Sequence, residues 1–191
     1  MDHTPTRDEA WKILTDHVRS PNLISHALAV EAAMRHVARK KGADEEMWGV
    51  VGLIHDVDYE EHPNEHLRHA PDLLRQHGWP ESYVRAVASH GWGICTNVEP
   101  VTDLEKALFA IDELTGLVAA ASLVRPSRSL LDLPVKSVLK KWKDKAFAAG
   151  VDRTVIEKGA AMMGVSLDEL IADTIEGMKT VAEKIGLKGN L

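Results

Sequence analysis

A histidine and an aspartate stand side by side where an apolar stretch of this chain stops. His55-Asp56 directly follows the apolar residues 50–54. An imidazole and a carboxylate can bind one transition-metal ion, because both groups offer lone pairs to it. Taken alone, such a pair is more typical of a buried, hydrogen-bonded histidine followed by a loop. The pair therefore becomes informative only if other metal-binding side chains accompany it.

Other candidate ligands occur at or near the apolar faces of further predicted helices. Buried imidazole and carboxylate groups are costly unless they are paired or bound to a metal. Several helices that each contribute such a group therefore indicate a shared metal site. The predicted metal ligands are His26, His55, Asp56, His69, His90 and Asp112.

Nitrogen and oxygen atoms must supply the ligands of any metal in this chain. Cys95 is the only cysteine, so no Cys-based zinc spacing and no intramolecular disulfide can occur. Imidazole and carboxylate groups suit Mn, Fe, Co, Ni or Zn better than Ca. We therefore expect a divalent transition metal, at one or two ions per chain.

Helices are the elements that must position these residues. Residues 20–41 form one predicted helix, with Ser20 and Pro21 typical of a helix start and Gly42 of a helix end. A nearly all-apolar helix follows over residues 44–56 and is expected at the centre of the fold. Further helices are predicted over residues 64–77, 80–90, from 102 onwards, 134–149, from 152 onwards and 166–185. Because no stretch alternates with period two, the predicted fold class is all-α.

Composition and charge limit the classes of protein to which the chain can belong. Its 191 residues are 45% hydrophobic and 27% charged, which is typical of one compact globular domain. No apolar run approaches the roughly 20 residues that a membrane span requires, so no membrane association is expected. The N-terminus lacks the basic and apolar regions of a signal peptide, and we expect a cytoplasmic protein.

The net charge of −6 argues against broad nucleic-acid binding, which needs a basic face. A few local Lys or Arg residues could still bind a small phosphorylated substrate. The basic helix at residues 134–149 is interpreted as a solvated face or a dimer surface, with phosphate attraction as the weaker interpretation. A homo-oligomer is therefore compatible with the sequence.

The order of the candidate ligands resembles the pattern of the HD-domain superfamily. That pattern is a His, then a His-Asp pair, then a distant Asp, here His26, His55-Asp56 and Asp112. The phrases Leu53-Ile54-His55-Asp56-Val57-Asp58 and Ala110-Ile111-Asp112 carry the resemblance, which covers residues 20–124. It implies an HD-domain helical bundle and, most often, metal-dependent phosphohydrolase chemistry. Residues 1–125 would form the metal-binding core, and residues 126–191 would add helices that pack on it, in the same domain or as a small lobe.

Dinuclear members of the superfamily have two further histidines between the pair and the last aspartate. His69-Ala70-Pro71 and Ser89-His90-Gly91 resemble these positions. His62 and His66 are rivals to His69, which is preferred on the resemblance alone. His66 and His69 would share one face of the helix predicted over residues 64–77.

Two positions depart from the superfamily pattern. Tyr59 stands three residues after Asp56, where some members have a Lys and others a Glu. The resemblance therefore assigns no catalytic acid; Asp56 and Asp58 are the predicted catalytic residues, with Asp58 alternatively orienting a ligand. The cyclic-dinucleotide branch has a pair of histidines where this chain has His90 alone, which argues against that substrate.

The expected activity is hydrolysis of a small phosphomonoester or phosphodiester, foremost a nucleotide, by a metal-activated water. His26, His55, Asp56 and Asp112 would hold the first ion, and His69 and His90 a second one that Asp56 bridges. A metal-binding regulatory module without turnover is one alternative, because the catalytic Lys or Glu is missing. A di-iron oxygenase of the HD type is the other, since the same six ligands would serve it.

Overall fold

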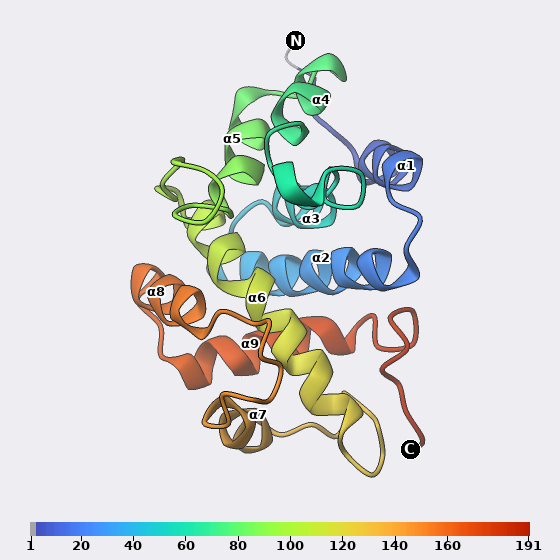
Figure 1. Ribbon diagram of the computed structural model, residues 1–191, viewed down its shortest axis with the longest axis vertical. Coiled ribbons are helices and arrows are strands. Elements are labelled where there is room, and N and C mark those ends of the chain that lie inside the picture. The colour runs from blue at the N-terminus through green and yellow to red at the C-terminus, as the bar shows by residue number, and fades with distance from the viewer. Residues whose placement is uncertain (1–2) are drawn as a thin grey trace.

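The computed structural model describes residues 3–191 and confirms the all-α prediction (Figure 1). Within these residues the chain forms nine α-helices and one short 3-10 helix, and no β-strand. The helices are α1 (Arg7–His17), α2 (Pro21–Lys41), α3 (Glu45–Ile54), η1 (Pro63–Glu65), α4 (Ala70–Gln76), α5 (Glu81–Ser89), α6 (Asp103–Leu123), α7 (Val135–Trp142), α8 (Arg153–Met163) and α9 (Leu167–Lys179). In the described part of the chain, no helix combines the length and the apolar character needed to cross a membrane.

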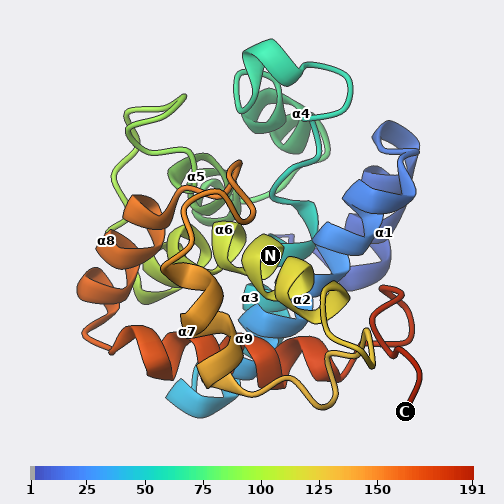
Figure 2. The same ribbon diagram turned by 60° about the horizontal axis from the view of Figure 1, so that its bottom comes forward.

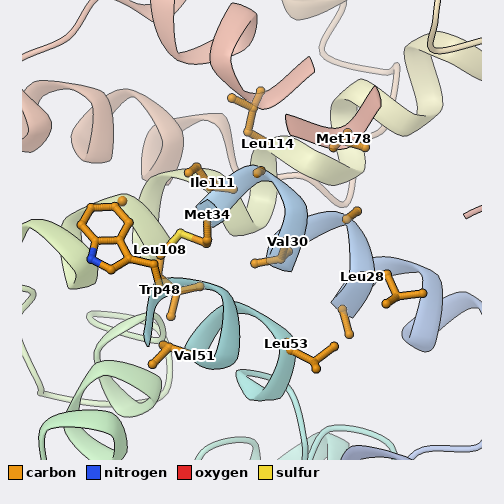
Figure 3. Packing of buried hydrophobic residues seen from close by; sticks show 14 of the residues in the cluster. Leu28, Val30, Met34, Trp48, Val51, Leu53, Leu108, Ile111, Leu114 and Met178 are labelled. Atoms are coloured by element: carbon orange, nitrogen blue, oxygen red, sulfur yellow. The ribbon is translucent and has the colours of Figure 1, made fainter. Parts of the chain in front are cut away.

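Helices α2, α3 and α6 form the centre of the molecule. Helix α2 lies between α3 on one side and α9 on the other (Figure 1). Figure 3 shows Val30 and Met34 of α2 packed among side chains of α3 and α6. Helices α2 and α3 approach closely at Gly52, where a Cβ would lie 3.2 Å from the backbone oxygen of Val30. This close approach holds the helix that carries His26 against the one that leads to His55.

Capping residues define the ends of the central helices as the sequence predicts. Ser20 and Pro21 begin α2, although the Ser20 side chain makes no capping hydrogen bond, and Gly42 ends it with a left-handed φ of 66°. Asp44 caps α3 by accepting a hydrogen bond from the backbone N–H of Met47. A stop at Gly42 and a start at Asp44 reverse the chain within a few residues, which places α3 back along α2.

The helix predicted over residues 64–77 is wrong in its first half. Residues 63–65 form the 3-10 helix η1, Leu67 has a φ of 63°, and α4 begins only at Ala70. A positive φ at a non-glycine residue is incompatible with a continuous right-handed helix. His66 and His69 therefore do not share a helix face. Two further helices are shorter than predicted, since α7 ends at Trp142 and α9 at Lys179.

The C-terminal segment packs on the helices that carry the candidate ligands. Helix α8 packs on α6 and α9 packs on α2 (Figure 2), and α9 lies on the side of α2 away from α3 (Figure 1). Met178 of α9 and Ile156 of α8 are fully buried and belong to the same hydrophobic cluster as Val30 of α2. Residues on both sides of position 125 thus share one core.

Candidate metal centre

Six potential metal ligands converge from five segments of the chain. Helices α2 and α6 contribute one residue each, the end of α3 and the following turn contribute two, and the end of α5 and the turn before α4 contribute one each. Their ligating atoms form two groups, each with all atoms within 4.8 Å of one another. The first group is His26, His55, Asp56 and Asp112, and the second is Asp56, His66 and His90.

In the first group, two imidazoles face two carboxylates. The Nε2 atoms of His26 and His55 lie 3.1 Å apart. Asp112 Oδ1 lies 3.0 Å from Nε2 of His26 and 3.3 Å from Nε2 of His55. Asp56 Oδ2 lies 3.5 and 3.4 Å from the same two nitrogens. The four ligating atoms thus lie close enough together to bind one metal ion.

The second group uses the other oxygen of Asp56. Asp56 Oδ1 lies 3.3 Å from Nε2 of His66 and 3.3 Å from Nε2 of His90. These two nitrogens lie 3.1 Å apart. Asp56 therefore offers one carboxylate oxygen to each group, which is the arrangement of a carboxylate that bridges two ions.

Backbone carbonyls set the tautomers of two of the four imidazoles. His55 Nδ1 donates to the carbonyl oxygen of Gly52 at 2.7 Å, and His90 Nδ1 donates to that of Val87 at 2.6 Å. A carbonyl oxygen only accepts, so the hydrogen of each neutral ring lies on Nδ1. Nε2 of each ring then carries a lone pair directed into the centre.

Side chains set the tautomers of the other two imidazoles. His66 Nδ1 donates to Asp58 Oδ1 at 2.9 Å. The hydroxyl of Thr115 donates to the Asp112 carbonyl at 2.8 Å, and it therefore accepts from His26 Nδ1, 3.3 Å away. All four rings consequently direct Nε2 into the two groups, as metal-bound histidines with a supporting acceptor do.

This donor set fits a bound cation. Two neutral imidazoles whose Nε2 atoms both carry lone pairs cannot hydrogen bond to each other, so each 3.1 Å pair needs a metal ion or protons between its nitrogens. Without a metal, burial lowers the pKa of His26, but hydrogen bonds and charge from Asp112 and Asp56 together raise it to about 9. The pKa of His55 is likewise raised well above its usual value, where burial is outweighed by the charges of the same two carboxylates.

Asp58 supports the centre without facing it. Its Oδ1 accepts the hydrogen bond from His66, and its Oδ2 accepts the backbone N–H groups of His69 (3.1 Å) and Ala70 (2.9 Å). Burial raises its pKa, but these hydrogen bonds outweigh burial and lower it. Since both oxygens are engaged and the side chain is buried, Asp58 orients a ligand, and the predicted direct catalytic role does not fit this geometry.

The structure does not bring His69 to the centre. Its side chain is 46% exposed, its ring stacks on that of His62 at a centroid distance of 3.8 Å, and its Nε2 faces Glu65. His66 occupies the place expected for His69, because the left-handed turn at Leu67 directs the two side chains to different sides. His26, His55, Asp56, His90 and Asp112 lie together as the sequence predicts, and His66, a rival to His69, completes the set.

A cavity of about 370 Å³ opens onto both groups. Glu113 contributes a half-buried carboxyl group to its wall, and its Oε2 accepts the backbone N–H of Asp152 at 3.0 Å. Burial and then the charge of Asp112 raise the pKa of Glu113 to about 7. Sequence reasoning missed Glu113; its position next to Asp112 was the available signal. The residues that line the cavity are Leu23, His26, Asp56, Tyr59, His66, His90, Gly91, Ile94, Cys95, Asp112, Glu113, Gly116, Val151 and Val155.

Comparison of the chain with protein-family models, curated proteins and solved structures finds no match. The likeness to the HD-domain superfamily therefore remains an interpretation of the motifs. The His and Asp groups that could hold a metal, and the cavity that reaches them, are properties of the fold itself.

Proposed function

We propose that the protein is a metal-dependent phosphohydrolase with a dinuclear centre, acting on a small phosphate ester. The observation that carries the proposal is that Asp56 presents one oxygen to each of two ligand groups at the base of a cavity. Sites with two metal ions about 3.5–4 Å apart are characteristic of enzymes that hydrolyse phosphate esters. The arrangement therefore favours hydrolysis over a single structural ion.

The ligand atoms define which ions the centre would hold. His26, His55 and Asp112 would bind the first ion and His66 and His90 the second, with Asp56 shared between them. Nitrogen and carboxylate oxygen ligands suit Mn, Fe, Co, Ni or Zn. When bound, such ions lower the pKa of a water molecule and offset the charge that develops on the phosphoryl oxygens.

Residues of the chain itself would orient the ligands and move a proton. Asp58 fixes the ring of His66, and Thr115 fixes that of His26. Glu113 lines the cavity outside the two ligand groups, and its Oε2 is held by the Asp152 N–H, which leaves Oε1 for a substrate. We assign Oε1 of Glu113 as the group that gives a proton to the leaving oxygen, a role that typically contributes ~10²–10⁴-fold to the rate.

The test is a screen of metal-loaded protein against phosphomonoesters, phosphodiesters and nucleotides, run in air and without oxygen. We expect hydrolysis that Mn or Co stimulates, that oxygen does not affect, and that Asp56→Ala abolishes. His77→Ala is the matched control, because His77 ends α4 outside both ligand groups, and its rate should equal that of the wild type.

Other outcomes would establish different functions. A product that forms only with Fe and consumes dioxygen would identify a di-iron oxygenase. Full metal loading with no turnover of any compound in the screen would instead indicate a metal-binding regulatory module. Either result would contradict the proposed hydrolase.

A further inference from the structure

The wall of the cavity is apolar above the metal centre. Leu23 comes from α2, Ile94 from the loop after α5, Val151 from the turn before α8, and Val155 from the first turn of α8. Val155 is buried, whereas Ile94 is 62% exposed at the rim. The part of a substrate that points away from the centre would therefore contact mainly hydrocarbon.

Positive charge is missing from this wall. Among the described residues that line the cavity, none is Lys or Arg. Glu113 adds a carboxyl group, which is neutral when protonated and negative otherwise, and never positive. Any positive charge that contacts a substrate in this cavity must therefore come from the bound metal ions.

The cations of the neighbouring helix are directed elsewhere. Arg153 lies between the wall residues Val151 and Val155 in sequence, but its guanidinium donates to the carbonyl oxygens of Trp142 (3.0 Å) and Phe147 (2.7 Å). Lys158 places its Nζ 3.4 Å from the centre of the Trp92 ring. Neither side chain lines the cavity, so α8 supplies hydrocarbon and no charge to the wall.

Formal charges then limit what the centre can neutralise. Two divalent ions bring four positive charges, and the carboxylates of Asp56 and Asp112 cancel two of them. The remaining two positive charges are at most enough for the dianion of one phosphomonoester. A second anionic group on the substrate would face an apolar wall and Glu113, where its charge would be desolvated and unpaired.

We propose that the cavity selects esters with a single phosphoryl group whose remaining part is uncharged, and that Leu23, Ile94, Val151 and Val155 form the subsite for that part. This inference rests on the proposed hydrolase function and narrows its substrate class. Nucleoside monophosphates and uncharged alkyl or aryl phosphates belong to the class. Nucleoside diphosphates and triphosphates do not.

Two non-hydrolysable probes that differ by one charge test the inference through binding. Phenylphosphonate and 4-carboxyphenylphosphonate are titrated calorimetrically into the Mn-loaded protein. We expect the carboxylated probe to bind about tenfold more weakly, because its additional charge would lose water without gaining a charged partner. Equal or tighter binding of the carboxylated probe would overturn the inference.

A pair of matched variants locates the effect in the cavity. Ile94→Lys places a cation at the rim and should reduce the difference between the two probes to about threefold or less. Val101→Lys makes the same change in charge at a position that is 57% exposed and lies outside the cavity, and it should keep the wild-type difference. An equal reduction of the affinity difference in both variants would indicate a general effect of protein charge and reject the subsite.

Hydrolysis of phenyl phosphate and AMP by the same preparation separates failure of the inference from failure of the proposed function. If either compound is hydrolysed while the two phosphonates bind equally well, only the subsite is rejected. If no compound of the full phosphoester and nucleotide screen is hydrolysed, the hydrolase function fails and the subsite fails with it.

Discussion

Each imidazole of the centre is oriented by a hydrogen-bond acceptor at its Nδ1 atom, and most of these acceptors could not be predicted from the sequence. The carbonyl groups of Gly52 and Val87 accept from His55 and His90, each three residues earlier in the chain than its histidine. Asp58, by contrast, lies eight residues from His66 and holds it through a turn. Residue types therefore predicted which atoms could bind a metal, whereas the turn decided which of two neighbouring histidines would do so.

Replacing His66 and His69 separately tests this assignment. His66→Ala should reduce the metal content from two ions to one per chain and lower the hydrolysis rate by at least about tenfold, because the second ion no longer shares the developing charge. His69→Ala should keep both ions and a rate close to wild type, since its side chain faces Glu65. Elemental analysis and circular dichroism check metal content and folding. Loss of an ion in His69→Ala but not in His66→Ala would instead identify His69 as the ligand.

Metal affinity should rise with pH because His26 must lose a proton to bind an ion. The pKa of His26 in the metal-free protein is about 9, so the ring is protonated at neutral pH. Below pH 9, each unit by which the pH falls should therefore weaken the metal affinity about tenfold for every proton displaced. Calorimetric titration with Zn between pH 7 and 9, in buffers of different ionisation enthalpy, measures the protons released. No proton release and no pH dependence would contradict this protonation state.

The same raised pKa affects the stability of the metal-free protein. The folded state retains the His26 proton up to about pH 9, whereas the unfolded chain releases it near 6.5. This contribution to stability is therefore complete below pH 6.5 and disappears as the pH rises through 9. Metal-free protein should accordingly lose stability over this range of pH.

Local signals predicted the central helices well and the irregular segments poorly. Ser20, Pro21 and Gly42 define α2 in the sequence and in the structure. The capping box of Thr6 and Glu9 starts α1, a readable signal that the prediction overlooked. The left-handed φ of Leu67 has no such signal, because leucine rarely adopts it. Asp58 stabilises this turn by accepting the N–H groups at the start of α4, a contact that depends on tertiary structure.

The contact between α6 and α8 allows a test of how the C-terminal helices support the cavity. A Cβ at Gly159 of α8 would lie 2.7 Å from the Cα of Ala110, two residues before Asp112. Gly159→Ala should therefore push α8 outward and destabilise the protein by about 1–3 kcal/mol. The melting temperature should fall by about 2–4 °C for each kcal/mol.

Gly150→Ala is the matched control for this change. Nothing lies within 4 Å of a Cβ at Gly150, in the same part of the chain. The melting temperature of this variant should stay the same or rise slightly, because the unfolded chain loses freedom. A fall of equal size in both variants would show that the close approach of α8 to α6 is not the cause.

Over the whole molecule, one hydrophobic core holds together ligands that lie between positions 26 and 112 of the sequence. The cluster includes residues of α2, α3, α6, α8 and α9. The centre can therefore form only in the folded chain, and a bound metal should stabilise the fold. The sequence alone predicted the central helices that carry His26, His55 and Asp112, but it could not predict that Val151 and Val155 line the cavity, because no motif marks that contact.

Metal loading should raise the melting temperature of the protein. A metal at 100 times its dissociation constant stabilises the folded state by about 2.7 kcal/mol. For a chain of this length, that corresponds to a rise of about 5–10 °C. Scanning calorimetry with and without Mn measures it, and Asp56→Ala should show no comparable rise. A wild-type melting temperature that does not respond to Mn, Co or Zn would argue against a metal centre.

Anomalous scattering from a crystal of the Mn-loaded protein tests the shared role of Asp56 most directly. We predict two peaks per chain about 3.5–4 Å apart, as in dinuclear hydrolases. One should lie among His26, His55 and Asp112, the other beside His66 and His90, with Asp56 between them. A single peak, or a second peak bound by His69 in place of His66, would contradict the dinuclear centre proposed for this protein.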